Sequence, residues 1–487
     1  MILLFSRFFN YIINFKKYKD VNYTFLRRNI IIFLCEVTQM FFRINSALSG
    51  FLWGPPMLAA FLSTGFFLSF RSGFFQVSGI RLWMGETVVS AFRSRHEKCT
   101  DGSISQFSAL TSALAACLGT GNIIGVATAI CSGGPGALFW MCVSAILGMM
   151  TCCCENILGI KYRTRDFTGR FKGGPMYYIE NGLGMKGLAG TYAVFLVGAS
   201  LGMGNMTQAN SVAQGMSGFG IPPFVTAAVL CILLGIAVSG GLGRISKISE
   251  KLIPALTAVF VAACFVIIIR NAENIIPCFR TVIKEAFTVK AVSGFGMAKA
   301  ARYGISRGVF SNEAGLGSSA IIHASADCKN AGEQGMWGIL EVFIDTVFMC
   351  TVTGAAILTS GVWSPEADVN GAVLCSGVFE SVFGRAGGYF LNACICLFAF
   401  ATLTSWSYYG KCGAEYLFGG KADKIYNVLY IICAFAGSLI RLESVWSISD
   451  TLNGLMAIPN IFALLLLNKE ALGELELVKM HKKIKKL

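Results

Sequence analysis

The segment Gly119-Thr120-Gly121-Asn122-Ile123-Ile124-Gly125 places three glycines and an asparagine inside a long apolar stretch. No Asp, Glu, Lys or Arg occurs from Gly102 to Cys154, which is long enough for two membrane crossings of roughly 20 residues each. A glycine-rich interruption of a membrane helix leaves backbone carbonyl and N–H groups without helical partners. Because lipid offers these groups no hydrogen bonds, they must face other protein groups or a ligand. The segment therefore predicts a broken transmembrane helix whose break forms part of a binding site.

A second interruption of this kind, Ser311-Asn312-Glu313-Ala314-Gly315-Leu316-Gly317, occurs later in the chain. Apolar runs separated by Gly, Pro and charged residues predict eleven membrane-spanning helices. The first is a leading helix, and the expected spans are about Gly54 to Phe70 and then near residues 105–131, 135–160, 189–215, 222–239, 252–269, 300–325, 334–360, 387–410, 425–440 and 446–467. The last ten divide into two sets of five, and an interrupted helix begins each set.

The odd number of helices in each set has a topological consequence. The second set would be inverted relative to the first, as in many secondary transporters. We therefore predict an all-α polytopic membrane protein with one leading helix and a 5+5 inverted repeat. Close helix packing is the alternative reason for a Gly-x-Gly pattern, but two corresponding breaks favour a binding site. The expected parts are a leading helix with a basic loop, the first repeat, an amphipathic connection, the second repeat and a basic tail, at 40–100, 101–270, 271–299, 300–468 and 469–487.

The composition excludes several other classes of protein. Hydrophobic residues make up 55% of the 487 residues, charged residues 14%, and the mean hydropathy is +0.64, which is too apolar for a soluble domain. The net charge of +14 comes from Lys and Arg between apolar runs, so we expect a lipid bilayer and no nucleic acid as partner. The 18 Cys and 3 His show no metal-ligand spacing, and nucleophile and phosphate-binding motifs are absent from the sequence. We therefore expect that the protein is not an enzyme and that it holds no cofactor and no metal other than a transported ion.

The basic segments predict the orientation in the membrane. Alternate crossings place five of them on one side, namely 71–98, 161–186, 244–251, 411–424 and 469–487. Because Lys and Arg are retained in the cytoplasm, this side and the C-terminus are predicted to be cytoplasmic. The basic stretch 270–299 falls on the other side and is interpreted as an amphipathic connection on the membrane surface.

The first 39 residues differ from the rest of the chain. They contain no Gly and no Ala, although the whole chain carries 55 Gly, and they are rich in Phe, Ile, Asn, Lys and Tyr. Such a composition is typical of translated AT-rich non-coding DNA. We therefore expect residues 1–39 to be an artefactual extension and Met40 to be the natural start.

The first break has the chemistry of an amino-acid and cation site. A half-helix that begins near Gly121 and Asn122 directs free N–H groups and a partial positive charge toward a carboxylate. The unwound carbonyl groups from Cys117 to Gly119 suit a hard cation. One amino acid and one sodium ion fit this arrangement.

Polar side chains on later helices can complete such a site. Thr402 and Trp406 are four residues apart, so they present a hydroxyl and an aromatic ring to the same cavity. Any single one of the polar side chains named in this paragraph can equally form a structural hydrogen bond between helices. The other candidates are the hydroxyls of Thr404 and Ser405 as sodium ligands, and the amides of Gln208 and Asn210 as partners of the substrate.

Ionisable and amide side chains at membrane depth are candidates for coupling or gating. Glu313, at the second break, either orients the unwound backbone and affects ion coupling or pairs with Arg302 or Arg307. Glu341 and Asp345 lie four residues apart on one helix face, where they require a partner or a water-filled path. The remaining candidates are Asn312 beside Glu313, His323 as a proton site, and Asp450, which with Asn453 is equally well interpreted as a helix cap.

Longer strings resemble a known family over about residues 46–467. In order, they are Trp53-Gly54-Pro55-Pro56, Gly119-Thr120-Gly121-Asn122, Gly133-Gly134-Pro135-Gly136, Gly173-Gly174-Pro175-Met176-Tyr177-Tyr178, Phe310-Ser311-Asn312-Glu313-Ala314-Gly315, Glu341-Val342-Phe343-Ile344-Asp345-Thr346, Trp406-Ser407-Tyr408-Tyr409-Gly410 and Asp450-Thr451-Leu452-Asn453-Gly454-Leu455-Met456-Ala457-Ile458-Pro459-Asn460. With these strings the sequence resembles the alanine or glycine:cation symporters, also called sodium:alanine symporters, of the amino acid-polyamine-cation superfamily.

The resemblance implies a fold like that of the bacterial leucine transporter, coupling to sodium or sometimes to protons, and alanine or glycine as substrate. It also implies that the substrate carboxylate meets Thr120, Gly121 and Asn122, with Gln208, Thr402 and Trp406 around the substrate. The expected function is therefore sodium-coupled uptake of a small neutral amino acid by alternating access. The alternatives are a proton-coupled symporter of the same fold and an amino-acid sensor derived from a transporter, which would need a larger partner-binding tail.

Overall fold

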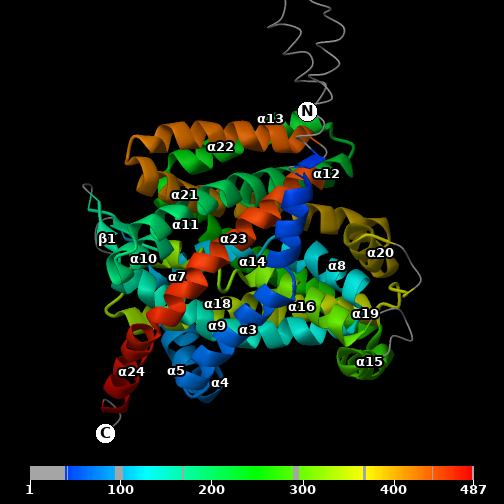
Figure 1. Ribbon diagram of the computed structural model, residues 1–487. Helices are drawn as coiled ribbons and strands as arrows, with labels where there is room; N and C mark the ends of the chain where they lie inside the picture. The colour runs from blue at the N-terminus through cyan, green and yellow to red at the C-terminus, as the bar shows by residue number, and fades with distance from the viewer. Residues whose placement is uncertain are drawn as a thin grey trace, which may run out of the picture. The chain divides into compact units, whose positions relative to one another are not determined.

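The computed structural model describes residues 39–40, 42–93, 103–166, 169–288, 296–365, 369–440 and 443–484 (Figure 1). The chain divides into two compact units, Met1–Leu48 and Ser49–Leu487, and the labelled helices and strands below belong to the second unit. Within the described residues this unit is almost entirely helical, as predicted. The expected extension, residues 1–39, lies outside the described residues except for its last residue.

Helix α3 (Pro55–Arg71) is the predicted leading helix. Two prolines occupy its first turn, where a missing N–H breaks no hydrogen bond and φ is already helical. Instead of a simple loop, the basic stretch that follows forms a row of short helical segments. These are α4 (Phe75–Ser78), α5 (Ile80–Met84), the π-helical η1 (Gly85–Val89) and α6 (Ser90–Arg93).

The first half of the remaining chain begins with the predicted interrupted helix. Its elements are α7 (Gln106–Cys117), η2 (Thr120–Asn122), α8 (Ile124–Gly133), α9 (Gly136–Lys161), α10 (Pro175–Leu183), α11 (Lys186–Leu201), η3 (Gly202–Met206), α12 (Thr207–Ser217), α13 (Pro223–Ser239) and α14 (Gly241–Arg270). A small antiparallel hairpin of β1 (Thr164–Arg165) and β2 (Phe171–Lys172) precedes α10.

The second half also begins with an interrupted helix. Before it lie η4 (Ala272–Asn274) and α15 (Ile275–Phe287), whose Val282 and Ala286 are buried while its charged residues are not. Its elements are α16 (Met297–Asn312), α17 (Ser319–His323), α18 (Ala331–Val342), η5 (Phe343–Cys350), α19 (Thr351–Thr359), α20 (Gly371–Phe383), α21 (Arg385–Phe418), α22 (Ala422–Leu439), α23 (Glu443–Leu466) and α24 (Asn468–Ile484).

Seven helices of the described residues are long and apolar enough to cross a membrane. They are Phe42–Arg71, Gly136–Lys161, Lys186–Ser217, Gly241–Arg270, Ala331–Thr359, Arg385–Phe418 and Ile448–Leu466. The other four expected spans correspond to the two interrupted helices, α13 and α22. The count of eleven crossings therefore stays a prediction.

Two helices occupy stretches that the sequence analysis treated as loop or tail. Helix α20 has 13 residues, which is too short for a crossing, so a search for long apolar runs passes over it. Helix α24 forms the expected basic tail. Its Glu470 and Glu474 lie 3.2 and 3.3 Å from Lys161 Nζ at the end of α9, which ties the tail to the helical core.

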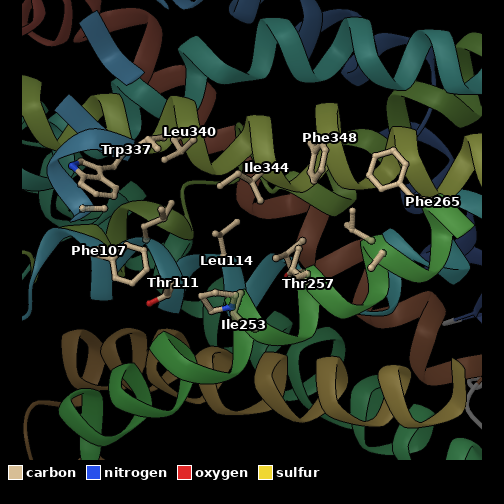
Figure 2. Close-up of a pocket in the computed structure, with 18 residues that line it drawn as sticks. Phe107, Thr111, Leu114, Ile253, Thr257, Phe265, Trp337, Leu340, Ile344 and Phe348 are labelled. Carbon is tan, nitrogen blue, oxygen red and sulfur yellow. The ribbon is translucent and has the colours of Figure 1, made fainter. Parts of the chain in front are cut away.

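Helix α9 is central to the packing, because α16, α17 and α18 all pack against it. Its Cys152, Cys153 and Cys154 are fully buried, and all 16 cysteines in the described part of the chain are free. This fits the interpretation of these cysteines as small apolar residues of membrane helices. On another side of the core, α7, α14 and α18 with η5 enclose an apolar groove (Figure 2).

Candidate substrate and ion site

The first break separates α7, which ends at Cys117, from α8, which begins at Ile124. Gly119 is extended, with φ −132° and ψ −151°, and the next three residues form a single turn. The Oδ1 atom of Asn122 accepts a hydrogen bond from the Gly119 N–H at 3.1 Å. The asparagine therefore closes the turn whose glycines indicated the break.

Asp345, in the π-helical η5, joins the two interrupted helices. Its Oδ1 and its carbonyl oxygen accept hydrogen bonds from Asn122 Nδ2 at 2.7 and 3.0 Å. Its Oδ2 accepts from Ser311 Oγ at 3.0 Å and from Thr346 Oγ1 at 2.6 Å, and Asn312 Nδ2 donates to the same threonine at 3.2 Å. The buried carboxylate thus has the partners that its place in an apolar helix requires.

Glu313 shapes the second break. Its backbone is left-handed, with φ 56°, which is uncommon for a residue other than glycine. Its carboxylate accepts hydrogen bonds from Trp406 Nε1 at 3.2 Å and from Ser318 Oγ. The alternative expectation of an arginine partner was wrong for the described residues, because the guanidinium groups of Arg302 and Arg307 lie over aromatic rings of their own helix, Tyr303 and Phe310.

A third buried carboxylate, Glu155 of α9, also holds the second break. Its Oε1 accepts hydrogen bonds from the Gly315 N–H at 2.9 Å and from Asn460 Nδ2 at 2.6 Å. Asn460 Nδ2 also donates to the Gly315 carbonyl at 2.9 Å, and Tyr192 OH donates to the Leu316 carbonyl at 2.9 Å. Glu155 was not among the predicted site residues, although a glutamate within an expected span is the sequence signal for such a residue.

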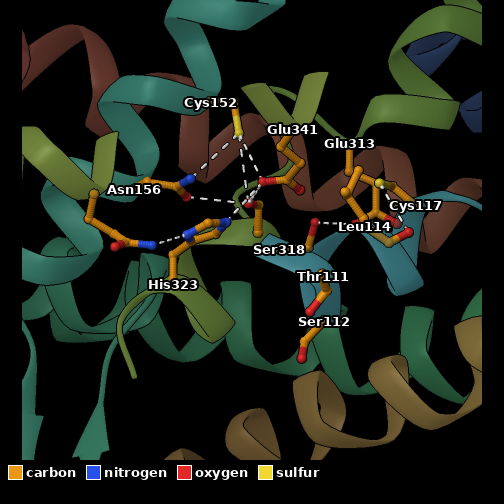
Figure 3. Close-up of polar contacts among 12 residues, drawn as sticks. Thr111, Ser112, Leu114, Cys117, Cys152, Asn156, Glu313, Ser318, His323 and Glu341 are labelled. Carbon is orange, nitrogen blue, oxygen red and sulfur yellow. Dashed lines mark hydrogen bonds and ion pairs between the residues drawn. The ribbon is translucent and has the colours of Figure 1, made fainter. Parts of the chain in front are cut away.

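Glu341 and His323 form a buried pair (Figure 3). His323 Nε2 lies 3.1 Å from Glu341 Oε2, which also accepts from Ser319 Oγ at 2.6 Å. Gln334 Nε2 donates to His323 Nδ1 at 2.5 Å, and Gln106 Nε2 donates to Gln334 Oε1 at 3.0 Å. A chain of polar groups therefore runs from the first turn of α7 to Glu341.

Thr402 and Gln208 lie beside the first break. Thr402 Oγ1 donates to the Ala115 carbonyl at 3.0 Å, near the end of α7. A Cβ atom on Gly119 would lie 2.9 Å from Thr402 Oγ1 and 3.8 Å from Gln208 Oε1, so this close approach requires a glycine. Gln208 Nε2 donates to the Met203 carbonyl at 3.3 Å, while its buried Oε1 has no hydrogen-bond partner among the described residues.

Trp406 packs directly onto a glycine of the π-helical η3. A Cβ atom on Gly204 would lie 2.4 Å from Trp406 Cγ, so a larger residue at this position would displace the indole. The ring also makes an edge contact with Tyr409, with centroids 5.3 Å apart. The buried Tyr409 hydroxyl lacks a partner within the described part of the chain, and Tyr409 was not among the predicted site residues.

The expected sodium ligands differ in whether their side chains already have a hydrogen-bond partner. Thr404 Oγ1 donates to the Ala401 carbonyl of its own helix at 2.8 Å, and Cys117 Sγ contacts the Leu114 carbonyl at 3.6 Å. The Ser405 hydroxyl is buried and has no partner among the residues described. Unpaired buried hydroxyls are uncommon and call for an unseen partner.

Three residues that were selected from the sequence have positions or partners that differ from the expected ones. Asn210 Nδ2 donates to the Gly437 and Ile440 carbonyls, both at 3.2 Å, which favours a structural bond to α22. Asp450 and Asn453 do not cap a helix, because α23 begins at Glu443 and both residues lie inside it. The Asp450 carbonyl accepts from Trp53 Nε1 at 3.0 Å.

Comparison with known proteins identifies the family. Residues 38–486 match the model of the sodium:alanine symporter family. The chain belongs to this family. A similar relative, the sodium/alanine symporter AgcS of Methanococcus maripaludis, is 40% identical over 89% of this chain and 96% of its own length. Two Bacillus subtilis relatives are the putative sodium/proton-dependent alanine carrier YrbD, with 31% identity over 90% of this chain and 92% of the relative, and the probable sodium/glutamine symporter GlnT, with 32% identity over 86% of both chains.

Solved transporters share the fold of this sodium:alanine symporter family member. MhsT in complex with L-phenylalanine gives a TM-score of 0.57 at 13% identity over 77% of this chain and 93% of MhsT. A Na+-coupled sialic acid symporter gives 0.52 at 15% identity over 86% of both chains. These similarities confirm the predicted leucine-transporter-like fold, and the family makes the protein a multi-pass membrane transporter and not an enzyme.

Proposed function

We propose that the chain carries a small neutral amino acid, alanine or glycine, into the cell together with Na+ by alternating access. The observation that supports this proposal most strongly is the set of hydrogen bonds at Asp345, which fixes the turn Thr120–Asn122 of the first break to the second break. A ligand that orders the first break thereby acts on both interrupted helices. The predicted location is the cell membrane, with the C-terminus in the cytoplasm.

The substrate carboxylate is proposed to meet backbone N–H groups at Thr120, Gly121 and Asn122. The Asn122 amide already bonds to Asp345 and Gly119, so its role is to hold the turn in place and not to contact the substrate. The unpaired Gln208 Oε1 offers an acceptor for the substrate ammonium group. Trp406, held between Gly204 and Glu313, forms an aromatic wall that limits the size of the substrate.

The sodium ion is proposed to lie between the end of α7 and helix α21. Carbonyl groups from Cys117 to Gly119 and the hydroxyls of Thr404 and Ser405 supply the oxygen ligands that a hard cation requires. One positive charge that moves down a membrane potential contributes roughly 2.3 kcal/mol per 100 mV. With one-to-one coupling this contribution supports an amino-acid gradient of nearly fiftyfold.

Ser405→Ala is expected to raise the Na+ concentration for half-maximal alanine uptake by about tenfold, the effect of losing roughly 1.4 kcal/mol of ligand interaction. Ser407→Ala is the matched control, because Ser407 is also a buried serine of α21, but its hydroxyl donates to the Thr404 carbonyl at 2.5 Å and it is not among the proposed sodium ligands. Uptake rates in proteoliposomes over a series of Na+ concentrations measure this effect. Equal Na+ dependence in the two variants would place the ion elsewhere.

The buried pair of His323 and Glu341 favours one alternative, coupling to protons. If sodium alone couples transport, an inward pH gradient in choline medium drives no alanine accumulation in the wild type. His323→Gln keeps a donor toward Glu341 and is then expected to retain Na+-driven uptake within about threefold, since one hydrogen bond to Glu341 replaces another. Accumulation in choline that disappears in His323→Gln would transfer the coupling to protons.

Uptake of radiolabelled alanine and glycine into proteoliposomes tests the proposed function. The purified full chain is given an inward Na+ gradient, and then Na+ is replaced by choline at fixed pH. We expect accumulation only with Na+. Competition by unlabelled glutamine tests whether the chain also accepts glutamine, the substrate in the name of one relative. Absence of uptake of either amino acid, with reconstitution verified, would contradict the substrate assignment.

A further inference from the structure

The groove between α7, α14, α18 and η5 has a volume of about 700 Å³ and meets the first break at Leu118. Phe107 and Trp337 lie at one end of it, and Phe265 and Phe348 lie at the other (Figure 2). Its lining is almost wholly aliphatic and aromatic. The Thr111 hydroxyl of the lining donates to the Ser108 carbonyl at 3.1 Å, whereas the buried Thr257 hydroxyl and Trp337 indole N–H have no hydrogen-bond partner among the described residues. Apart from these two isolated polar atoms the surface is apolar, so it suits a ligand that is mostly hydrocarbon.

The groove opens toward the lipid-facing side of α14. This helix, Gly241–Arg270, is among the candidate membrane spans, and its lining residues Ala258, Ala262 and Phe265 are exposed. Phe348 of η5 is 37% exposed at the same end. In a multi-pass membrane protein such an exposed apolar surface borders lipid chains. The groove is therefore continuous with the surface that contacts the hydrocarbon of the bilayer.

The length of the groove matches one leaflet. Pro254 and Phe265 both line it and are eleven residues apart on α14, which corresponds to about 16 Å at 1.5 Å per residue. The hydrocarbon core of a bilayer is about 30 Å thick, so one leaflet contributes about half of this thickness. The groove thus has the length of one acyl chain in its own leaflet.

Positive charge lies at the end of α14 nearest Pro254. Lys247 and Lys251 precede Pro254, Ala258 and Ala262 at steps of three or four residues, so all five share one helix face. Both lysines are exposed, and neither forms an ion pair with another described residue. They belong to a segment that the distribution of Lys and Arg over the loops predicts to be cytoplasmic. This charge complements the phosphate of a phospholipid headgroup.

We propose that this groove binds an anionic phospholipid of the cytoplasmic leaflet, with one acyl chain between α7, α14 and α18 and the phosphate near Lys247 and Lys251. The acyl chain packs against Leu114 and Leu118 of α7. Leu118 directly precedes Gly119, so the bound lipid stabilises the half-helix that ends at the first break. The binding itself does not depend on which amino acid or ion is transported.

Photolabelling of the full chain tests this site. The protein is reconstituted in phosphatidylcholine vesicles that contain phosphatidylglycerol with a diazirine at mid-acyl chain, and the labelled peptides are mapped. We expect labelling to concentrate on residues 253–265 and 337–348. Ala258→Trp fills the groove and is expected to lower labelling by about tenfold, the loss of roughly two buried methylene contacts.

Val259→Trp is the matched control, because Val259 is exposed on the same helix at 54% but does not line the groove. The Lys247→Gln, Lys251→Gln double variant leaves the groove intact and is expected to reduce labelling by phosphatidylglycerol roughly fivefold per lysine, without affecting labelling by a matched phosphatidylcholine probe. Equal labelling of Ala258→Trp and Val259→Trp would overturn the site. Labelling spread evenly over all lipid-facing helices would overturn it as well.

Discussion

Asp345→Asn is expected to lower Na+-driven alanine uptake by about a hundredfold. The aspartate accepts hydrogen bonds from Asn122, Ser311 and Thr346, and bonds to a carboxylate are roughly twice as strong as bonds to a neutral acceptor. The amide weakens these bonds and leaves at least one buried donor without an acceptor, at a cost of about 3 kcal/mol, which corresponds to two powers of ten in rate. Initial uptake rates in proteoliposomes at equal protein content measure the effect.

The control for this variant is Asp423→Asn on α22. Asp423 pairs with Lys411 at 2.6 Å and contacts neither break, so this variant is expected to keep nearly normal uptake. If Asp345→Asn also transports normally, the connection between the two breaks through this carboxylate has no role in transport.

Asn122→Asp is expected to abolish uptake and to lower the thermal stability of the protein. The new carboxylate would lie within hydrogen-bond distance of Asp345, where the amide now donates at 2.7 Å. Two buried like charges replace one charge-assisted bond, which costs about 3 kcal/mol or more. Thermal unfolding in detergent, followed together with uptake, measures both effects.

The reciprocal variant Asn122→Asp, Asp345→Asn separates the structural effect from the transport effect. In this double variant the amide at position 345 donates to the new carboxylate and its oxygen accepts from Ser311 and Thr346, while the main-chain carbonyl of residue 345 loses the bond that it accepts from Asn122. We expect thermal stability to recover in large part and transport to stay low, because the negative charge now lies in the turn proposed to bind the substrate carboxylate. Failure of stability to recover would show that the contact is not a simple donor–acceptor pair.

The sequence allowed the prediction of both breaks because glycine and asparagine inside apolar runs are strong local signals. The contacts of the breaks needed three-dimensional information. Asp345 was expected to need a partner, but nothing in the chain's order indicates that Asn122, 223 residues away, supplies it. Sequence distance gives no measure of spatial distance between helices packed in one core.

Other features were missed because the sequence criteria were set for long apolar spans. Helix α20 is too short for such a criterion. Glu155 served only to mark the end of a charge-free run, although its carboxylate accepts a hydrogen bond from the backbone of the second break. The interpretation of Asp450 and Asn453 as caps failed because α23 begins earlier than the apolar run that marks it. Helix boundaries depend on neighbouring elements as well as on local sequence.

Parallel measurement of radioactive sodium and radiolabelled alanine entering the same proteoliposomes, at a clamped membrane potential, tests the central claim most directly. Sodium-coupled symport predicts that alanine increases sodium entry, that sodium increases alanine entry, and that Ser405→Ala shifts both dependences together. Alanine entry that is unaffected by sodium, with no alanine-dependent sodium flux, would contradict the account.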